Sequence, residues 1–359
     1  MTFSRPAPAP VLTAVPRTKE TQADGILLGV NTYWNPEKLT NGHVAIIGAS
    51  GSGKTQTLKA LALELYLNYH HLNIYIVDFH GDQQIQDEFC YPMHMNSPYG
   101  INPLVINLDP EGGGPAIQAI ALSASLRKNL QLGPNQEGHL IHLVSEVYRK
   151  AFINQQDKNS WRLPPPTFAE LKKEIDEHVK DGCKECQKLQ TKLAATFTYG
   201  IFNRRGFPHD QRLSRIDLCK LPPEVGAIAA EAMAKQLMDS HRLMGETKQP
   251  RTYIVIDEAK EMSKSPALDR IVCDGRKYGL SLIVASQSER HLSPDVIGNS
   301  ATKIVLPVDQ SEVGKVAKKF RFAESRVSQL QQLQALCRIG TEVKSTNIVP
   351  YFRRVSTLH

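Results

Sequence analysis

The chain has 359 residues, of which 41% are hydrophobic, and this share is ordinary for a globular protein and too high for wholesale disorder. It carries 43 Lys and Arg against 36 Asp and Glu, and the resulting net charge of +7 permits a polyanionic partner without requiring one. Six cysteines are too few for a disulfide scaffold, and no apolar run reaches the roughly 18–20 residues of a membrane span. These features argue against a secreted or integral membrane protein and favour a cytoplasmic one.

The first half of the chain predicts a tail, a hairpin and two buried strands. Residues 1–20 contain Pro6, Pro8, Pro10 and Pro16, so we expect an extended or disordered tail, with an arm docked on a neighbouring subunit as the alternative. Beyond it we expect a hairpin at 26–34, strands at 43–47 and 73–78, and a helix from Lys54 to Tyr69.

The middle of the chain is predicted to be helical and the last third to alternate again. No strong strand pattern interrupts the stretch from Pro115 to Phe202, and Thr167 with Glu170 forms a capping box. We therefore expect an α/β core at 21–112 and 203–359 with a helical insertion at 113–202. Solid apolar strands alternating with helices predict an α/β fold with a mostly parallel sheet. The later strands are expected at 215–219, 253–257, 281–286 and 303–307, and the later helices at 223–244, 258–278 and 311–320, before a final segment near 338–349.

A glycine-rich turn carries the strongest motif. Residues 48–55 read GASGSGKT and fit G-x-x-x-x-G-K-[ST] between an apolar strand and a helix. Glycines let backbone N–H groups converge on phosphate oxygens, and the helix N-terminus adds partial positive charge there. We expect Lys54 to reach the β- and γ-phosphates of ATP and Thr55 to hold Mg²⁺. The expected nucleotide-binding residues are Gly48, Ser50, Gly51, Ser52, Gly53, Lys54, Thr55 and Gln56.

Polar side chains also follow three other predicted strands. Asp257 and Glu258 end the strand at 253–257, and parallel strands gather their carboxyl ends at one edge, where the glycine-rich turn also lies. Asp257 suits Mg²⁺ binding through water, and Glu258 suits the polarisation of an attacking water. Gln287 is either a sensor of the γ-phosphate or a solvated loop residue. Asp78 and His80 either line the site or simply begin a loop.

The order of these motifs resembles the HerA/FtsK superfamily of P-loop ATPases. The segments GASGSGKT, IVDFHGD, INPL, IVIDEAK, DGRKYGLSLIVASQS and TKIVLPVD follow one another as in the HerA-like branch. This branch is related to type IV secretion ATPases and to TraG-type coupling ATPases of conjugation. The resemblance extends from about Gly29 to Leu333.

The resemblance implies a RecA-like P-loop ATPase core that carries the helical insertion. It also implies a homohexameric ring with ATP at the subunit interfaces and DNA in the central channel. Glu258 would be the catalytic carboxylate and Gln287 the γ-phosphate sensor. An arginine from the adjacent subunit would complete the site, and Arg276 in DGRKYG is the first candidate. Its rivals are Arg270, Arg204 and Arg205, and each of these four arginines has a solvated surface role as the alternative.

The function expected from these motifs is an ATP-driven DNA translocase or helicase-like motor. It would serve a partner nuclease or a repair, defence or DNA-transfer complex. The alternatives are a protein-export ATPase of the type IV secretion kind and a nucleotide-gated ring scaffold that activates a partner effector. The sequence leaves the DNA form, the direction of movement and the partner open.

Two weaker patterns remain. Cys183 and Cys186 form a CxxC pair with His178 upstream, which is half of a zinc site or, as we favour, two ordinary helix cysteines. A basic run on the last predicted helix is either a DNA-facing patch or, as is more usual, a solvated helix face. The run consists of Lys315, Lys318, Lys319 and Arg321.

Overall fold

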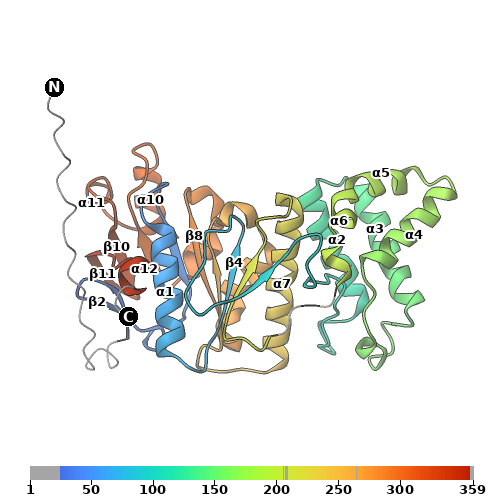
Figure 1. The fold of residues 1–359 in the computed structure, drawn as a ribbon, viewed down its shortest axis with the longest axis horizontal. Coiled ribbons are helices and arrows are strands. Elements are labelled where there is room, and N and C mark those ends of the chain that lie inside the picture. The colour runs from blue at the N-terminus through green and yellow to red at the C-terminus, as the bar shows by residue number, and fades with distance from the viewer. Residues whose placement is uncertain (1–24, 205, 207–208, 264, 356–359) are drawn as a thin grey trace.

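A mostly parallel sheet forms the centre of the molecule, which the computed structural model describes over residues 25–204, 206, 209–263 and 265–355 (Figure 1). Within these residues nine strands pair in the order β11-β10-β9-β3-β8-β7-β4-β6-β5. Neighbours from β9 to β5 are parallel, whereas β10 is antiparallel to both β9 and β11. The α/β fold is confirmed, and the tail expected at 1–20 lies outside the described residues. The strands are β3 (Val44–Ile47), β4 (Asn73–Asp78), β5 (Phe89–Pro92), β6 (Leu213–Asp217), β7 (Thr252–Ile256), β8 (Leu280–Ser286), β9 (Thr302–Val305), β10 (Gln334–Ile339) and β11 (Glu342–Asn347).

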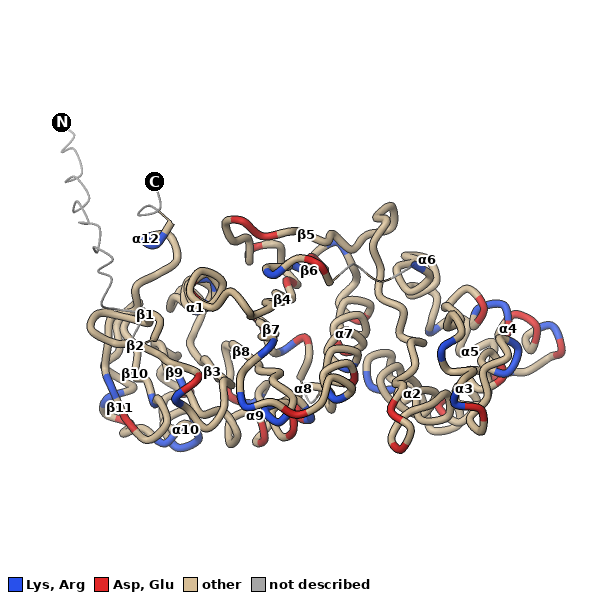
Figure 2. The backbone as a smooth tube through the Cα atoms, turned by 90° about the horizontal axis from the view of Figure 1, so that it is seen from below, with Lys and Arg blue, Asp and Glu red and all other residues tan. Residues whose placement is uncertain are grey.

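Both faces of the sheet are buried at its central strands β3, β7 and β8, where successive residues point to opposite sides and all of them are buried. On β3, Val44 and Ile46 join the apolar cluster beneath α1, while Ala45 and Ile47 join the cluster on the other face. Figure 2 shows α1 on one side of the sheet and α8 and α9 on the other. The helices of these two layers are α1 (Lys54–Asn68), α7 (Pro223–Leu243), α8 (Pro266–Asp274), α9 (Pro294–Asn299), α10 (Val313–Phe320), α11 (Glu324–Val327) and α12 (Tyr351–Val355).

The segment between β5 and β6 forms a group of helices at one end of the long axis, here called the helical lobe (Figure 1). Its α4 begins with the expected capping box, in which Thr167 accepts a hydrogen bond from the Ala169 N–H and Glu170 binds the Thr167 N–H. Phe168, Leu171 and other apolar side chains bury the helices against one another. The lobe consists of α2 (Pro115–Leu130), α3 (Pro134–Lys150), α4 (Phe168–Lys180), α5 (Lys184–Lys192) and α6 (Ala194–Tyr199).

The stretch expected to be one helix from 258 to 278 is divided. It forms a 3₁₀ turn η5 (Ala259–Met262), α8, and a second 3₁₀ turn η6 (Gly275–Tyr278). Pro266 has no N–H to continue a helix and instead occupies the first turn of α8. The final segment near 338–349 is the hairpin β10–β11, and β5 has no counterpart among the expected strands.

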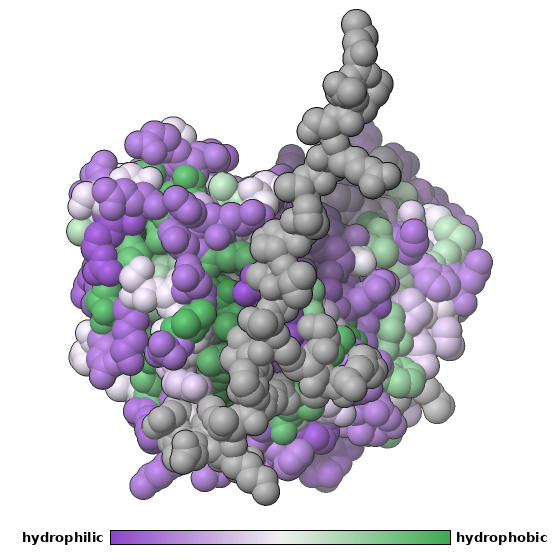
Figure 3. Space-filling view, turned by 60° about the vertical axis from the view of Figure 1, so that its left-hand side comes forward, coloured by the Kyte–Doolittle hydropathy of each residue, from purple (hydrophilic) through white to green (hydrophobic). Residues whose placement is uncertain are grey.

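A small hairpin joins the two ends of the described chain. β1 (Ile26–Gly29) and β2 (Thr32–Trp34) are antiparallel around Asn31, as expected, and Gly29 bridges to Ile348 near the C-terminus. The surface drawn in Figure 3 is largely hydrophilic, with apolar residues interspersed. Across the described residues, no helix has both the length and the apolar character needed to cross a membrane.

Candidate active site

The carboxyl ends of four neighbouring strands meet at one edge of the sheet, here called the nucleotide edge. Strands β3, β8, β7 and β4 are adjacent and parallel, so the loops that follow them converge. They enclose a polar pocket of about 420 Å³. Its lining residues are Ser50, Gly51, Gly53, Lys54, Thr55, Gln56, His80, Asp82, Asp257, Glu258, Gln287, Gln332, Leu333 and Phe352.

The glycine-rich turn after β3 presents backbone to this pocket. Gly51 and Gly53 have φ values of +74° and +109°, a region that side chains with a Cβ rarely adopt. Gly53 is the residue before α1 and supplies no side-chain cap, so the N–H groups of the first turn of α1 remain available to a ligand. Together these features form an anion-binding helix terminus.

Lys54 is buried beneath the pocket with only 7% of its surface exposed. Its Nζ donates a hydrogen bond to the Ala49 carbonyl at 2.9 Å. Burial lowers the pKa of Lys54, and the nearby carboxylates of Asp257 and Glu258 act in the opposite direction. Burial takes the Lys54 ammonium out of water, and a bound phosphate would replace the lost interactions with its negative charge. The site is therefore suited to a polyphosphate.

Thr55 and Asp257 come together across 202 positions of sequence. The Thr55 hydroxyl donates to Asp257 Oδ2 at 2.7 Å, and Gln83 Nε2 donates to the same oxygen at 2.7 Å. Burial raises the pKa of Asp257 above its usual value. A hydroxyl and a carboxylate side by side are oxygen ligands of the kind that Mg²⁺ takes in nucleotide sites, so these two residues fit that ion.

Glu258 has an unusual backbone conformation for a residue with a side chain. Its φ and ψ are both 63°, in the left-handed region, where a residue other than glycine is strained. Gln287 Nε2 donates to Glu258 Oε2 at 2.9 Å, and Glu258 is only 9% exposed. The Gln287 amide thus holds the Glu258 carboxylate at the pocket wall. The two residues line the same pocket and are hydrogen-bonded to each other.

Asp78 and His80 have different positions. Asp78 is buried and accepts hydrogen bonds from the Gly81 N–H at 2.7 Å and from the Arg215 guanidinium at 3.0 Å. It therefore organises the loop after β4 and does not line the pocket. His80 and Asp82, from the same loop, do line it.

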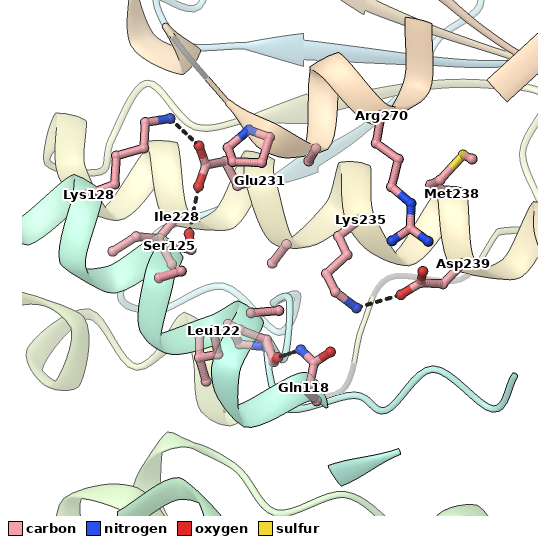
Figure 4. Close-up of a pocket in the computed structure, with 16 residues that line it drawn as sticks. Gln118, Leu122, Ser125, Lys128, Ile228, Glu231, Lys235, Met238, Asp239 and Arg270 are labelled. Atoms are coloured by element: carbon pink, nitrogen blue, oxygen red, sulfur yellow. Dashed lines mark hydrogen bonds and ion pairs between the residues drawn. The ribbon is translucent and has the colours of Figure 1, made fainter. Parts of the chain in front are cut away.

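Of the arginine candidates, those that the structure describes are not among the residues that line the pocket of their own chain. Arg276 is exposed on η6. Arg204 donates to the His94 carbonyl at 2.7 Å, and Arg205 lies outside the described residues. Arg270 lines a second, mainly apolar cavity of about 280 Å³ between α2, α7 and α8, where Figure 4 shows it near Met238 and Asp239.

Three pocket residues from near the C-terminus had no recognisable signal in the sequence. Gln332 Nε2 donates to the Gly51 carbonyl at 3.0 Å, and the Leu333 N–H donates to the Ser52 carbonyl at 3.2 Å. The Phe352 N–H donates to Gln56 Oε1 at 3.3 Å. Gln83, which binds Asp257, was equally unmarked, because no motif specifies where these loops dock.

The basic run lies on α10 and the residue that follows it. Lys315 pairs with Glu312 at 3.1 Å, and Lys319 pairs with Glu289. Lys318 and Arg321 are exposed. Two of the four cations are thus already paired with carboxylates.

Comparison with known proteins finds similarity to one family model and to one curated relative. Residues 21–109 match the family model described as "Helicase HerA, central domain". A probable helicase of Methanocaldococcus jannaschii, MJECL08, is 22% identical over 319 residues, which are 78% of this chain and 60% of that protein. This chain thus spans less than two thirds of that relative's length.

Two solved structures share the fold. VirB4 of Thermoanaerobacter pseudethanolicus superposes with a TM-score of 0.76 at 20% identity over 90% of this chain and 96% of that one. The plasmid coupling protein TrwB in complex with ADP and Mg²⁺ gives a TM-score of 0.60 at 16% identity, over 95% and 96% of the two chains. The resemblance to HerA-like P-loop ATPases and the P-loop ATPase fold are both confirmed.

Proposed function

We propose that this HerA-like P-loop ATPase is a motor that hydrolyses ATP to move DNA, and that it works as a homohexameric ring. The observation that carries the proposal is the convergence of Lys54, Thr55, Asp257, Glu258 and Gln287 on one pocket. A binding site alone would not need a strained, buried carboxylate beside the phosphate-binding turn. A cytoplasmic location belongs to the same proposal, because the sparse cysteines favour it.

Each of these five side chains would have a role in phosphoryl transfer. Lys54 and the first turn of α1 would neutralise the phosphate oxygens, and Thr55 with Asp257 would hold Mg²⁺. When bound, Mg²⁺ would offset the charge that develops on the β- and γ-oxygens. Glu258 would accept a proton from the attacking water, and Gln287 would orient Glu258 through the hydrogen bond of 2.9 Å.

The partner in this proposal is nucleic acid. The net charge of +7 and the exposed cations of α10 support contact with a phosphate backbone. Such contacts make binding weakly sequence-specific and strongly dependent on salt. We further propose that the motor serves a partner nuclease or effector protein. The process would be DNA repair, defence or DNA transfer.

The central test is ATP hydrolysis with and without DNA, at low and moderate salt, by the unmodified chain and by Glu258→Gln. We expect DNA to stimulate hydrolysis, salt to weaken the stimulation, and Glu258→Gln to lower turnover by about 10²–10⁴ while ATP still binds. Glu261→Gln is the matched control, because Glu261 belongs to the 3₁₀ turn η5 that directly follows Glu258 and lies outside the pocket.

The same assay separates the competitors. Hydrolysis that ignores DNA would favour a protein-export ATPase, and assembly on ATP with negligible turnover would favour a ring scaffold. An unmodified chain that neither binds nor hydrolyses ATP would end the proposal. The mass of the assembly with and without ATP tests the ring directly.

Arg276 is proposed to enter the site of the neighbouring subunit, because it is exposed and lies outside its own pocket. Arg276→Ala and Glu258→Gln should each be inactive alone. Mixed in one ring, they should regain activity, since an Arg276→Ala subunit keeps Glu258 and can receive Arg276 from its neighbour. Arg270→Ala serves as the control. Full activity of Arg276→Ala alone would remove the assignment.

A further inference from the structure

One cluster of metal-ligating side chains lies far from the nucleotide edge, in the helical lobe. The imidazole of His139 and the thiols of Cys183 and Cys186 have ligand atoms that all lie within 4.8 Å of one another. His139 belongs to α3, while Cys183 and Cys186 belong to the turn between α4 and α5 and to the first turn of α5. The fold therefore brings a third ligand to a CxxC pair from a helix that is remote in the sequence.

We propose that His139, Cys183 and Cys186 bind one Zn²⁺ ion, with water in the fourth position. Two sulfurs and one imidazole nitrogen form a soft ligand set that suits zinc and does not suit Mg²⁺ or Ca²⁺. Ligand atoms around a tetrahedral zinc are separated by roughly 3.5–3.8 Å. The separations here need only a small inward movement, which the exposed side chain of His139 can make.

The local structure already favours a thiolate at Cys183. Cys183 is the N-cap of α5, and its Sγ accepts a hydrogen bond from the Cys186 N–H at 3.4 Å. A helix N-terminus and an N–H···S bond both stabilise negative charge on sulfur, which is the form that binds metal.

The histidine that the sequence placed near the pair is not part of this cluster. His178 Nε2 lies 3.5 Å from Glu174 Oε1 on its own helix. Among the described residues, the cluster gains no fourth His, Cys, Asp or Glu ligand. Because His139 is exposed, solvent can reach the remaining coordination position.

The site would fasten two parts of the helical lobe together. α3 packs against α5 through buried apolar residues, including Leu143 and Leu189 (Figure 1). Zinc held by His139 on one side and by the two cysteines on the other would add a link at the end of this contact. We therefore expect zinc to stabilise the lobe and to leave the chemistry at Lys54 unchanged.

The first experiment measures zinc in the full chain purified under reducing conditions without chelator. We expect about one zinc per chain, and we expect Co²⁺ substitution to give the sulfur-to-cobalt charge-transfer absorption of thiolate ligation. Cys183→Ser should abolish stoichiometric zinc, and His139→Gln should weaken zinc affinity at least about tenfold against a competing chelator. His139 is exposed and Cys183 is half-buried, so neither substitution touches the buried Cys186.

Matched controls separate ligation from general damage. Cys273→Ser removes an exposed cysteine elsewhere, and His142→Gln removes an exposed histidine one turn along α3. Both should retain zinc. Chelator should lower the unfolding temperature of the unmodified chain and not that of Cys183→Ser.

Two results would overturn the site. One is a reduced chain that takes up neither zinc nor cobalt, and the other is zinc that survives both Cys183→Ser and His139→Gln. ATP hydrolysis is expected to be the same in all these variants, so failure of the zinc site would leave the ATPase proposal standing.

Discussion

Buried ionisable side chains gather at the nucleotide edge, whereas buried apolar side chains hold the helical lobe together. At the edge, Lys54 and Glu258 are at most 9% exposed, and Glu258 has a strained backbone. In the lobe, Phe168 and Leu171 are fully buried within one apolar cluster. Buried charge and strain cost stability, and burial of apolar surface supplies it. Substitutions at the nucleotide edge should therefore affect activity more than stability, and substitutions in the core of the helical lobe should affect stability more than activity.

The largest expected loss of stability comes from truncating a buried side chain in the core of the helical lobe. Phe168 packs its ring 4.8 Å from that of Phe202 and 6.2 Å from that of Phe197. Phe168→Ala should lower the free energy of unfolding by about 3–5 kcal/mol, because it removes apolar contacts and leaves a cavity. Denaturant titration measures this loss. The control is Phe152→Ala, a phenylalanine of the same lobe that is 84% exposed and should change stability by less than about 0.5 kcal/mol. Reduced ATP turnover per folded Phe168→Ala molecule would contradict the division of roles.

The converse change is Lys54→Ala at the nucleotide edge. It removes a buried cation from the phosphate-binding turn, so we expect kcat/KM for ATP to fall by at least about 10²–10³. The free energy of unfolding without nucleotide should change little or rise, since the buried ammonium is desolvated. Steady-state hydrolysis and denaturant titration measure the two effects. Lys173→Ala, exposed on α4, is the control. A large loss of stability in Lys54→Ala would break the comparison, because Lys54 would then be a structural residue.

The same contrast explains which features the sequence could predict. The strands and the loop around Lys54 were predictable because the motif is contiguous and lies at a strand end. The approach of Asp257 to Thr55 followed from the rule that parallel strands end on one edge. Gln83 and Gln332 were not predictable, because their places depend on how a loop and the β10–β11 hairpin dock. His139 was missed for the same reason, since only the packing of α3 on α5 brings it to the cysteines.

A smaller effect is expected at the start of α4. Thr167→Ala removes the side chain that caps the Ala169 N–H and leaves the backbone N–H of residue 167, which Glu170 binds, in place, so we expect a loss of about 1 kcal/mol in the free energy of unfolding. Thr191→Ala is the control, because this exposed threonine on α5 binds only the carbonyl of Gln187 one turn back. If both variants lose the same free energy of unfolding, the Thr167 cap contributes nothing beyond the difference in helix propensity between threonine and alanine.

The smallest effect concerns the contact between the C-terminal segment and the nucleotide edge. Gln332 donates to the Gly51 carbonyl at 3.0 Å from an exposed position, and a single neutral hydrogen bond of this kind contributes about 0.5–1 kcal/mol. Gln332→Ala should therefore weaken ATP binding about two- to fivefold, because part of the ordering of the turn would then accompany binding. Gln331→Ala, its exposed neighbour, should have no effect in the same titration. No change in Gln332→Ala would mean that the turn is ordered by its own glycines and by α1, whereas a loss far above tenfold would mean that Gln332 touches the nucleotide itself. Either result decides whether the segment before β10, which carries Gln332, belongs to the nucleotide site or only covers it.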